Sequence, residues 1–289
     1  MRQSLRVLTI LLLTGCTNTR IVAPTADGKP AVIAHRGSSY SAPEHTFAAY
    51  DLAVAEGADY LEQDVHRTSD GVLVVIHDAT LDRTARGDPA ACTGLVAEKT
   101  FAQIRTCDAG SWFNSLHPDR ARGEYVGLKV PTLAEVVGRY GSRARYYIEV
   151  KDPAKYPGIE TALMALLLEQ GLTGMAEGRP RVIIQSFDAA SLKRFSGLNP
   201  RLPVVQLMGQ QSSAATVAML DSVMGYASGI GPHREGVDVS LVNAALTRGL
   251  IVHPYTVDDP SEMKTLLDMK VSGMFTNRPG VLRKIIDDR

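Results

Sequence analysis

The feature that most constrains this 289-residue chain is a regular alternation of short apolar runs with segments of helical periodicity. Short apolar runs are typical of buried strands, whereas apolar residues three or four positions apart indicate amphipathic helices. The predicted strands are Ala31–Ala34, Tyr60–Val65, Tyr146–Val150, Val182–Gln185, Val204–Leu207, Tyr226–Ile230, Leu250–His253 and Gly273–Phe275. Between most of them lie helical segments, such as Thr46–Glu56, Gly158–Glu169 and Pro260–Met269. Eight strand–helix units predict an α/β fold of the (β/α)₈ TIM-barrel type.

A doubly wound open sheet is the alternative architecture. It is disfavoured because no G-x-G-x-x-G follows the first strand. Residues 31–289 are therefore expected to form one barrel domain. Residues 85–130 interrupt the alternation and are predicted to be a small inserted subdomain. Because long insertions often act as lids, we expect it to roof the pocket, with Trp112 or Phe113 in its apolar core or at its rim.

The first residues of the chain have the pattern of a targeting segment. Arg2 and Arg6 lie before or next to the short apolar run VLTILLL, and the chain then reads Leu13-Thr14-Gly15-Cys16. This pattern resembles a bacterial lipoprotein signal peptide (residues 1–15), in which Cys16 is lipidated; an ordinary signal peptide is the alternative. Residues 16–30 are polar and predicted to be a tether. The sequence thus predicts a protein of the cell envelope, anchored to a membrane by its lipid and facing the periplasm.

Charge and cysteine content narrow the range of partners. The chain has 31 basic and 31 acidic residues, so it has no net positive charge of the kind that nucleic-acid binding requires. Apart from Cys16, the chain contains Cys92 and Cys107. An even pair in an oxidising compartment predicts a disulfide, although two buried free thiols are the alternative.

The stretch YLEQDVHRTSDGVLVVIHD (residues 60–78) places two carboxylates inside a predicted strand. Glu62 and Asp64 are two residues apart and therefore point to the same side. Asp70-Gly71 predicts a two-residue hairpin turn, which would place His77 directly opposite Asp64. Two like charges on one buried face repel each other, so a cation is expected to offset the repulsion.

Charged side chains also end two further predicted strands, where TIM barrels place their active sites. The residues expected to converge at this rim are His35, Arg36, Glu62, Asp64, His77, Glu149 and Lys151. Three carboxylates without cysteine suit one divalent cation, Mg²⁺ or Ca²⁺. Arg36 and Lys151 suit a phosphate, and two histidines can act as general base and general acid. This set of residues predicts metal-assisted cleavage of a phosphodiester.

The same residues lie in motifs that resemble those of the glycerophosphodiester phosphodiesterase family. The family pattern H-R-G, P-E-N-T, G-A-D-x-x-E-x-D-V, T-x-D-G-x-x-V-x-H-D and L-x-R-T runs through AHRGSSYSAPEHTFAAYDLAVAEGADYLEQDVHRTSDGVLVVIHDATLDRT. Further matches, such as YYIEVK, VIIQSFD and GMFTNRPG, extend the resemblance from residue 31 to about residue 284.

The resemblance implies a phospholipase-C-like TIM barrel with a small insertion. It implies hydrolysis of deacylated phospholipids, such as glycerophosphocholine, to sn-glycerol 3-phosphate and an alcohol. By position in the motifs, it implies that Glu62, Asp64 and Glu149 bind the metal. His35 and His77 are then catalytic, and Arg36 and Lys151 contact the phosphate.

Two departures from the family pattern leave substrate preference open. P-E-N-T is here Pro43-Glu44-His45-Thr46, which adds a histidine near the site. W-T-V-N is here Tyr255-Thr256-Val257-Asp258, in which Tyr255 keeps an aromatic wall. We include Glu44 and Tyr255 among the expected substrate-binding residues.

Two other functions are compatible with the same barrel. A lysophospholipase D-type enzyme would need an apolar groove for an acyl chain, and a non-catalytic binding lipoprotein would not need both histidines. Of the remaining histidines, His66 should face away from the site, and His117 and His233 should lie at the surface. His253, Gln185 and Ser186 end strands, so either pocket lining or packing is possible for them.

Overall fold

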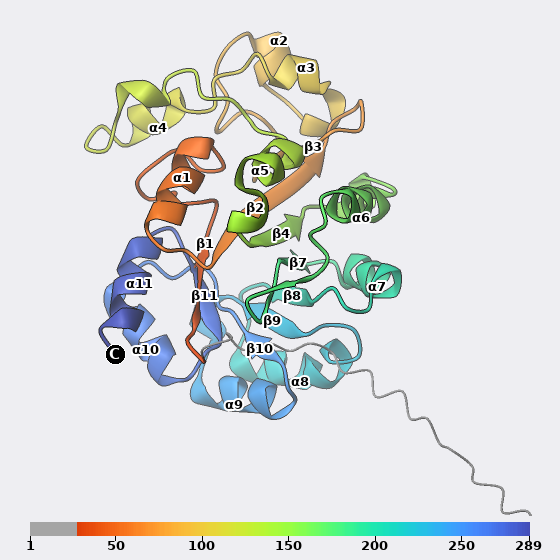
Figure 1. Cartoon of the computed structure of the whole chain (residues 1–289), viewed down its shortest axis with the longest axis vertical. Helices are drawn as coiled ribbons and strands as arrows, with labels where there is room; N and C mark the ends of the chain where they lie inside the picture. The colour runs from red at the N-terminus through yellow and green to blue at the C-terminus, as the bar shows by residue number, and fades with distance from the viewer. Residues whose placement is uncertain (1–27) are drawn as a thin grey trace, which may run out of the picture.

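The computed structural model describes residues 28–289, and within them eight parallel strands form a nearly closed barrel (Figure 1). The predicted signal peptide, Cys16 and most of the tether lie outside the described residues. In chain order the strands are β1 (Ala31–Ala34), β2 (Tyr60–Arg67), β4 (Tyr146–Val150), β7 (Val182–Ser186), β8 (Val204–Met208), β9 (Gly229–Pro232), β10 (Ile251–Val252) and β11 (Gly273–Thr276). All eight predicted strands are present, with ends shifted by at most three residues.

The barrel closes between its last two strands. Neighbouring strands follow the order β10-β9-β8-β7-β4-β2-β1-β11, and all these pairs are parallel. The Ser272 N–H donates to the Val252 carbonyl and the Phe275 N–H to the Pro254 carbonyl, both at 3.0 Å. These bonds join β11 to the segment of β10, so the TIM-barrel prediction is confirmed and the open sheet is excluded.

Eight helices surround the strands. They are α1 (Phe47–Ala55), α5 (Leu133–Tyr140), α6 (Ile159–Glu169), α7 (Ala189–Leu198), α8 (Ser213–Val223), α9 (Val239–Thr247), α10 (Pro260–Asp268) and α11 (Pro279–Asp287). Most begin with a side chain that accepts a bond from a backbone N–H of the first turn, as Thr46 and Asp259 do. Such caps satisfy donors that a helix leaves unpaired, and they fix where each loop ends and its helix begins.

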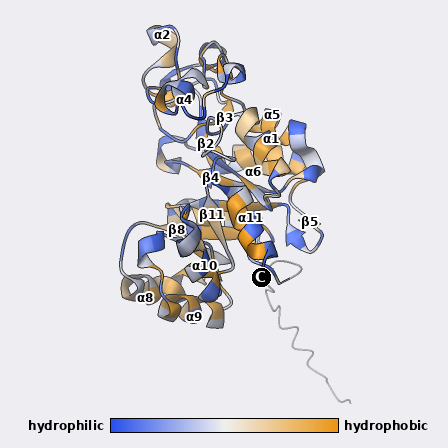
Figure 2. Ribbon diagram, turned by 90° about the vertical axis from the view of Figure 1, so that its left-hand side faces the viewer, coloured by the Kyte–Doolittle hydropathy of each residue, from blue (hydrophilic) through white to orange (hydrophobic). Residues whose placement is uncertain are grey.

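The apolar core has two layers. Residues such as Ile33, Tyr147 and Phe275 fill the inside of the barrel, and a larger cluster lies between the strands and the helices. Figure 2 shows hydrophobic colouring along the central strands, including β8 and β11. The interior leaves no room for a side chain at Gly229, where a Cβ atom would lie 2.2 Å from Ile251 Cγ1. Parallel strands buried on both faces are apolar in this way.

The hairpin after β2 differs from the prediction by one residue. Strand β3 (Leu73–Val75) pairs antiparallel with β2, with Val65 opposite Val75. The turn therefore contains three residues, and Asp64 lies opposite Ile76 rather than His77, whose predicted position was wrong. Gly71 takes the left-handed position that three-residue hairpin loops favour (φ 89°). The Thr68 hydroxyl donates to Asp70 at 2.6 Å and accepts from the Val72 N–H, which stabilises this longer turn.

The predicted insertion forms a separate lobe between β3 and α5. It contains α2 (Pro89–Cys92), η1 (Val96–Glu98), α3 (Phe101–Ile104), α4 (Ser111–Leu116) and η2 (Gly123–Tyr125). In both ribbon views it lies beyond α1 and α5, at the opposite end of the molecule from α8 and α9 (Figures 1 and 2). Cys92 and Cys107 are joined by a disulfide inside one of its two small apolar clusters.

The second cluster of the insertion contains Trp112, Phe113 and Tyr125, which pack with Ala42 and Ala49. Trp112 and Phe113 are therefore core residues of the insertion. Among residues 28–289, no helix is both long enough and apolar enough to cross a membrane.

Candidate active site

A cavity of about 340 Å³ opens at the carboxyl ends of the barrel strands. Most of the predicted site residues line it: His35, Arg36, Glu62, His77, Glu149, Lys151 and Tyr255. Asp64 is buried directly beside them, in contact with Arg36 and Lys151. Within the described chain, no residue of 85–130 lines the cavity, so the expectation that the insertion roofs it was wrong.

The turn after β1 positions Arg36 over the carboxylates. Arg36 and Gly37 both have positive φ (58° and 84°), and a Cβ atom on Gly37 would lie 2.7 Å from the backbone of Ala49. This left-handed turn directs the Arg36 N–H to Glu62 Oε2 at 2.7 Å. Arg36 Nε lies 3.4 Å from Asp64 Oδ2. A non-glycine residue in this conformation is uncommon and frequently marks a functional site.

Glu62, Asp64 and Glu149 converge because β2 and β4 are neighbours in register. Asp64 lies opposite Glu149, and Glu62 is two residues before Asp64 on the same side of β2. Lys151 Nζ lies 2.9 Å from Glu149 Oε1 and 3.6 Å from Asp64 Oδ1. A lysine thus offsets part of the negative charge of the group.

The electrostatics of these carboxylates show that they are short of positive charge. Burial, and then the charge of Asp64, raises the pKa of Glu62 well above its usual range and that of Glu149 to about 8. Burial opposes ionisation of Asp64 too, but Lys151, His45 and Arg36 together hold its pKa well below its usual range. Without a further cation, the three carboxylates are not all ionised at neutral pH.

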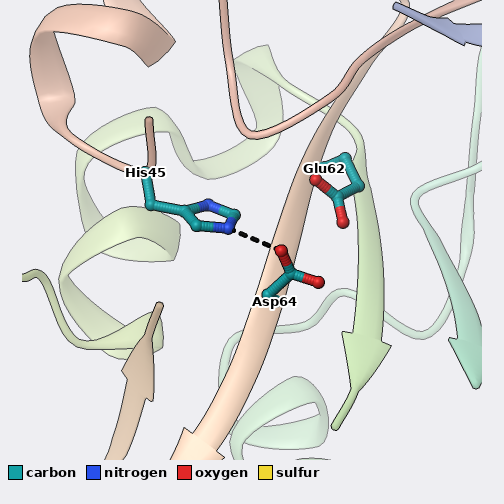
Figure 3. Close-up of side chains that lie close together, drawn as sticks. All are labelled: His45, Glu62 and Asp64. Carbon is teal, nitrogen blue, oxygen red and sulfur yellow. Dashed lines mark hydrogen bonds and ion pairs between the residues drawn. The ribbon is translucent and has the colours of Figure 1, made fainter. Parts of the chain in front are cut away.

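A metal ion fits two of these carboxylates, Glu62 and Asp64, together with His45, whereas Glu149 is paired with Lys151 beside this set. His45, Glu62 and Asp64 each offer a ligand atom, and these atoms lie within 4.8 Å of one another (Figure 3). Asp64 Oδ1 is buried without a hydrogen-bond partner, as is Oε1 of the neighbouring Gln185. Buried acceptors without a donor are rare, and oxygen ligands suit a hard divalent cation.

His45 is held between two residues of the site. Its Nε2 lies 2.8 Å from Asp64 Oδ2, and its Nδ1 lies 2.8 Å from the Tyr50 hydroxyl, which donates to the Glu62 carbonyl. Both ring nitrogens are therefore engaged, and His45 fixes the orientation of Asp64. From the sequence it was only an extra histidine near the site.

The two predicted catalytic histidines have different partners. His35 Nδ1 lies 2.7 Å from Asn277 Oδ1, and His77 Nδ1 lies 2.6 Å from Asp78 Oδ1. Asn277 Oδ1 also accepts from Ser39, and Asn277 Nδ2 donates to Asp258, so Asn277 Oδ1 accepts a hydrogen bond from the His35 Nδ1–H. In both histidines Nδ1 thus carries a proton, which leaves Nε2 for chemistry.

The environments of these histidines lower their affinity for a second proton. Burial, and then the charge of Arg36, lowers the pKa of His35 to about 3. Burial also lowers the pKa of His77, although Asp64 and Asp78 oppose that shift. A neutral imidazole is the form that can accept a proton as a general base.

Several predictions for other residues can now be checked. Glu44 does not line the cavity but pairs with Arg36 at 3.0 Å, behind it. His66 faces away from the cavity and contacts Tyr156, as predicted. His233 lines the cavity, so its predicted surface position was wrong. Its place follows from β9, which extends to Pro232 and so ends two residues later than predicted.

The remaining strand-end residues divide between lining and packing. Gln185 lines the cavity, whereas the Ser186 hydroxyl donates to the Val150 carbonyl. His253 is buried below the cavity, with Nδ1 3.1 Å from the Tyr147 hydroxyl. His117 lies on the insertion against the ring of Phe113.

Several residues at the site were not predicted from the sequence as site residues. Asn277 directly follows β11, so the strand-end rule could have identified it. Phe187 follows β7, is half exposed, and packs edge-to-face with Tyr255 at a ring distance of 6.1 Å. Asp78 and its partner Arg83 lie in a loop without a periodic pattern, although both belong to the family motifs ending in H-D and L-x-R-T.

Comparison with known proteins agrees with this geometry. Residues 35–281 match the model of the glycerophosphoryl diester phosphodiesterase family. The chain is 44% identical over 254 residues to a glycerophosphodiester phosphodiesterase of Bacillus subtilis, which covers 88% of this chain and 85% of that protein. It is 35% identical to a probable glycerophosphodiester phosphodiesterase 1 of Mycobacterium tuberculosis, over 90% of this chain and 94% of the relative.

Solved structures show the same fold. A crystal structure of a glycerophosphoryl diester phosphodiesterase from Silicibacter pomeroyi superimposes with a TM-score of 0.75 at 28% identity, covering 90% of this chain and 94% of that one. An Oleispira antarctica phosphodiesterase, solved in complex with the product sn-glycerol-3-phosphate, superimposes with a TM-score of 0.73 at 28% identity and similar coverage, 90% and 98%. Motifs, barrel and relatives together show that the chain belongs to the glycerophosphoryl diester phosphodiesterase family.

Proposed function

We propose that this protein hydrolyses glycerophosphodiesters to sn-glycerol 3-phosphate and an alcohol, and that the reaction depends on a divalent metal ion. The observation that carries the proposal is the composition of one cavity. It contains two histidines with separate hydrogen-bond partners, the cationic side chains of Arg36 and Lys151, and a group of buried carboxylates. The activity is that of the family and of the Bacillus subtilis relative.

Glu62, Asp64 and Glu149 would hold the cation, with His45 orienting Asp64. When bound, a divalent cation of this kind stabilises negative charge that develops on phosphoryl oxygens. Arg36 and Lys151 lie beside these carboxylates and can bind the remaining phosphoryl oxygens. Oxygen ligands alone favour Mg²⁺ or Ca²⁺ over zinc.

The two histidines then divide the proton transfers. His35, neutral and held by Asn277, takes the proton of the glycerol 2-hydroxyl as that oxygen attacks phosphorus. His77 acts as the acid in its imidazolium form, in which Nδ1–H is bonded to the Asp78 carboxylate and Nε2–H delivers a proton to the leaving alkoxide. The assignment rests on the partners: a carboxylate stabilises an imidazolium, whereas a neutral amide does so much less. Hydrolysis of the resulting cyclic glycerol phosphate completes the reaction.

The surroundings of the cavity favour deacylated substrates over lysophospholipids. A groove of about 420 Å³ adjoins the cavity and shares Glu149, Lys151 and Phe187 with it. Besides the apolar residues Pro153 and Ala154, the charged residues Asp152, Lys155 and Asp188 line this groove. The exposed apolar residues of the insertion, such as Leu116 and Val126, do not line either space. The charged side chains of the groove suit a polar alcohol better than an acyl chain.

Product analysis tests the proposed reaction. The purified protein is incubated with glycerophosphocholine, other glycerophosphodiesters and lysophosphatidylcholine, after chelation and again with Mg²⁺ or Ca²⁺ restored. We expect sn-glycerol 3-phosphate from the deacylated esters only, and only with metal. Full turnover after chelation would refute the metal dependence, and faster turnover of the lysolipid would refute the substrate class.

We further propose that Cys16 carries a lipid that anchors the protein to a membrane of the cell envelope, facing the periplasm. The support is the sequence pattern before Cys16. Metabolic labelling with a fatty-acid analogue should mark the wild-type protein, whereas Cys16→Ser should remain unlabelled. Equal labelling of both would contradict the proposal.

A further inference from the structure

Arg83 binds two carboxylates at once, in the loop that leads from β3 to the insertion. Its Nε lies 2.6 Å from Asp78 Oδ2, and its Nη2 lies 3.1 Å from Asp78 Oδ1. On the other side, Nη1 and Nη2 lie 2.9 and 2.7 Å from the two oxygens of Glu44. Both contacts are bidentate, the geometry in which arginine fixes a carboxylate in position as well as in charge.

Each of these carboxylates has a second partner, and both partners line the cavity. Asp78 Oδ1 lies 2.6 Å from His77 Nδ1, and Glu44 Oε1 lies 3.0 Å from Arg36 Nη1. One continuous chain of charged hydrogen bonds therefore runs from His77 through Asp78, Arg83 and Glu44 to Arg36. We propose that Arg83 is a positioning residue that holds the proton-donating His77 and the phosphate-binding Arg36 in fixed relation to each other.

The insertion supports Arg83 from behind. The Arg83 guanidinium carbon lies 5.8 Å from the centre of the Trp112 ring, in the apolar core of the insertion. Such a contact between a cation and an aromatic face is favourable. The insertion thus acts on the site by bracing Arg83, although it does not cover the cavity.

Stability alone does not account for this arrangement. The Arg83 side chain is 41% exposed, and ion pairs at that exposure contribute little to the free energy of unfolding. The role of Arg83 is geometric, because a planar guanidinium can bind both carboxylates bidentately and a lysine ammonium cannot. Loss of Arg83 should leave Asp78 free to rotate away from His77 and should leave Glu44 with Arg36 alone.

The test compares Arg83→Met and Arg83→Lys with the matched control Arg139→Met. Arg139 also binds one carboxylate, Asp51, with two nitrogens, and its side chain is 47% exposed, but it is not connected to the cavity. The kcat and KM values are measured on glycerophosphocholine and on a nitrophenyl ester of glycerol phosphate, with thermal unfolding in parallel.

We expect both Arg83 variants to lower kcat on glycerophosphocholine by roughly 10–100-fold, as loss of an outer-shell partner does. The loss should be smaller on the nitrophenyl ester, because its leaving group hardly needs a proton. Arg139→Met should match the wild type. A kcat of Arg83→Met within twofold of the wild type, or an equal loss on both substrates, would overturn the inference.

A double-mutant cycle gives a second, independent measurement. If Arg83 acts through Asp78, then Arg83→Met should lower kcat little further in an Asp78→Asn background. Fully additive losses of kcat would contradict this. Should Arg83→Met fail to fold, the same cycle is measured with Arg83→Lys and Asp78→Asn, and its result tests the inference.

The inference rests on the proposed role of His77, and His77→Ala separates the two failures. If His77→Ala retains wild-type turnover, the proposed proton donor is wrong. If His77→Ala is inactive while both Arg83 variants are normal, only the role of Arg83 is wrong.

Discussion

The role of each residue at this site depends on the neighbouring side chain that holds it in place as well as on its own chemistry. The two histidines look alike in the sequence, yet an amide holds His35 and a carboxylate holds His77. In the same way, Asp64 is oriented by His45, which is itself held by Tyr50. Partners of this kind fix which nitrogen carries a proton and where a ligand oxygen points.

The division of labour between the histidines gives the first prediction. Replacing either His35 or His77 by alanine should lower kcat on glycerophosphocholine by roughly 10²–10⁴-fold. His77→Ala should recover much of its activity on a nitrophenyl ester, because that leaving group departs without a proton. His35→Ala should remain impaired on both esters. Steady-state kinetics on the two substrates check this, and the reverse pattern would exchange the two roles.

The contact of His45 with Asp64 gives a second prediction. His45→Leu should weaken binding of the divalent cation roughly 10–100-fold, since it removes a partner of a ligand without removing the ligand. His45→Asn, which can still donate to Asp64, should lose less metal affinity than His45→Leu, and Glu62→Gln should lose more. Activity titrated with Mg²⁺ or Ca²⁺ should be restored in His45→Leu at high metal concentration. An unchanged metal requirement in His45→Leu would contradict the role assigned to His45.

Among the secondary-structure elements, the position of a residue at a strand end determines whether its side chain lines the cavity or packs in the core. Strand β4 places Glu149 at the cavity, whereas β10 is followed by His253, which is buried against Tyr147. Burial lowers the pKa of His253 to about 3. This histidine is therefore neutral in the folded chain at neutral pH.

His253 should contribute to acid sensitivity. Its pKa in the unfolded chain is near 6.5 and in the folded chain about 3, so the unfolded chain binds the extra proton between these values. The stabilisation is complete above pH 6.5 and is lost as the pH falls towards 3. In His253→Gln, the dependence of the unfolding free energy on pH should be shallower by up to about 1.4 kcal/mol per pH unit in this window. Urea unfolding at pH 7 and pH 5 measures it, and equal slopes would refute the contribution.

Most elements, but not their connections, were predictable from the sequence. Strands β1 and β4 were located to the residue, because buried apolar runs and parallel pairing leave few alternatives. The hairpin was displaced by one residue, since the Thr68 hydroxyl and Gly71 stabilise a turn longer than Asp70-Gly71 implies. The L-x-R-T motif contains Arg83, but its partners could not be predicted, because the contacts join loop residues through side chains alone, without any period.

In the whole molecule, the barrel and the insertion have apolar clusters of different size, and one cluster of the insertion also includes Ala42 and Ala49 of the barrel domain. The barrel buries a large apolar layer between strands and helices, whereas the insertion has two small clusters, one built around Cys92 and Cys107. A small apolar core stabilises a lobe weakly, and a disulfide compensates for this by restricting the unfolded chain. The insertion should therefore depend on its disulfide much more than the barrel does.

Reduction of the disulfide should loosen the insertion and leave the barrel folded. The bond closes a loop with a sequence separation of 15, for which the chain-entropy model gives a stabilisation of about 3 kcal/mol. The paired variant Cys92→Ser/Cys107→Ser should be cleaved faster by proteases between residues 90 and 110. Its metal affinity should stay unchanged, because the carboxylates lie on β2 and β4. Its kcat should fall in the manner of Arg83→Met, since a loosened insertion no longer braces Arg83 through Trp112. Limited proteolysis, metal titration and kinetics on one preparation check the three effects, and a fall in metal affinity together with kcat would show instead that the barrel itself depends on the bond.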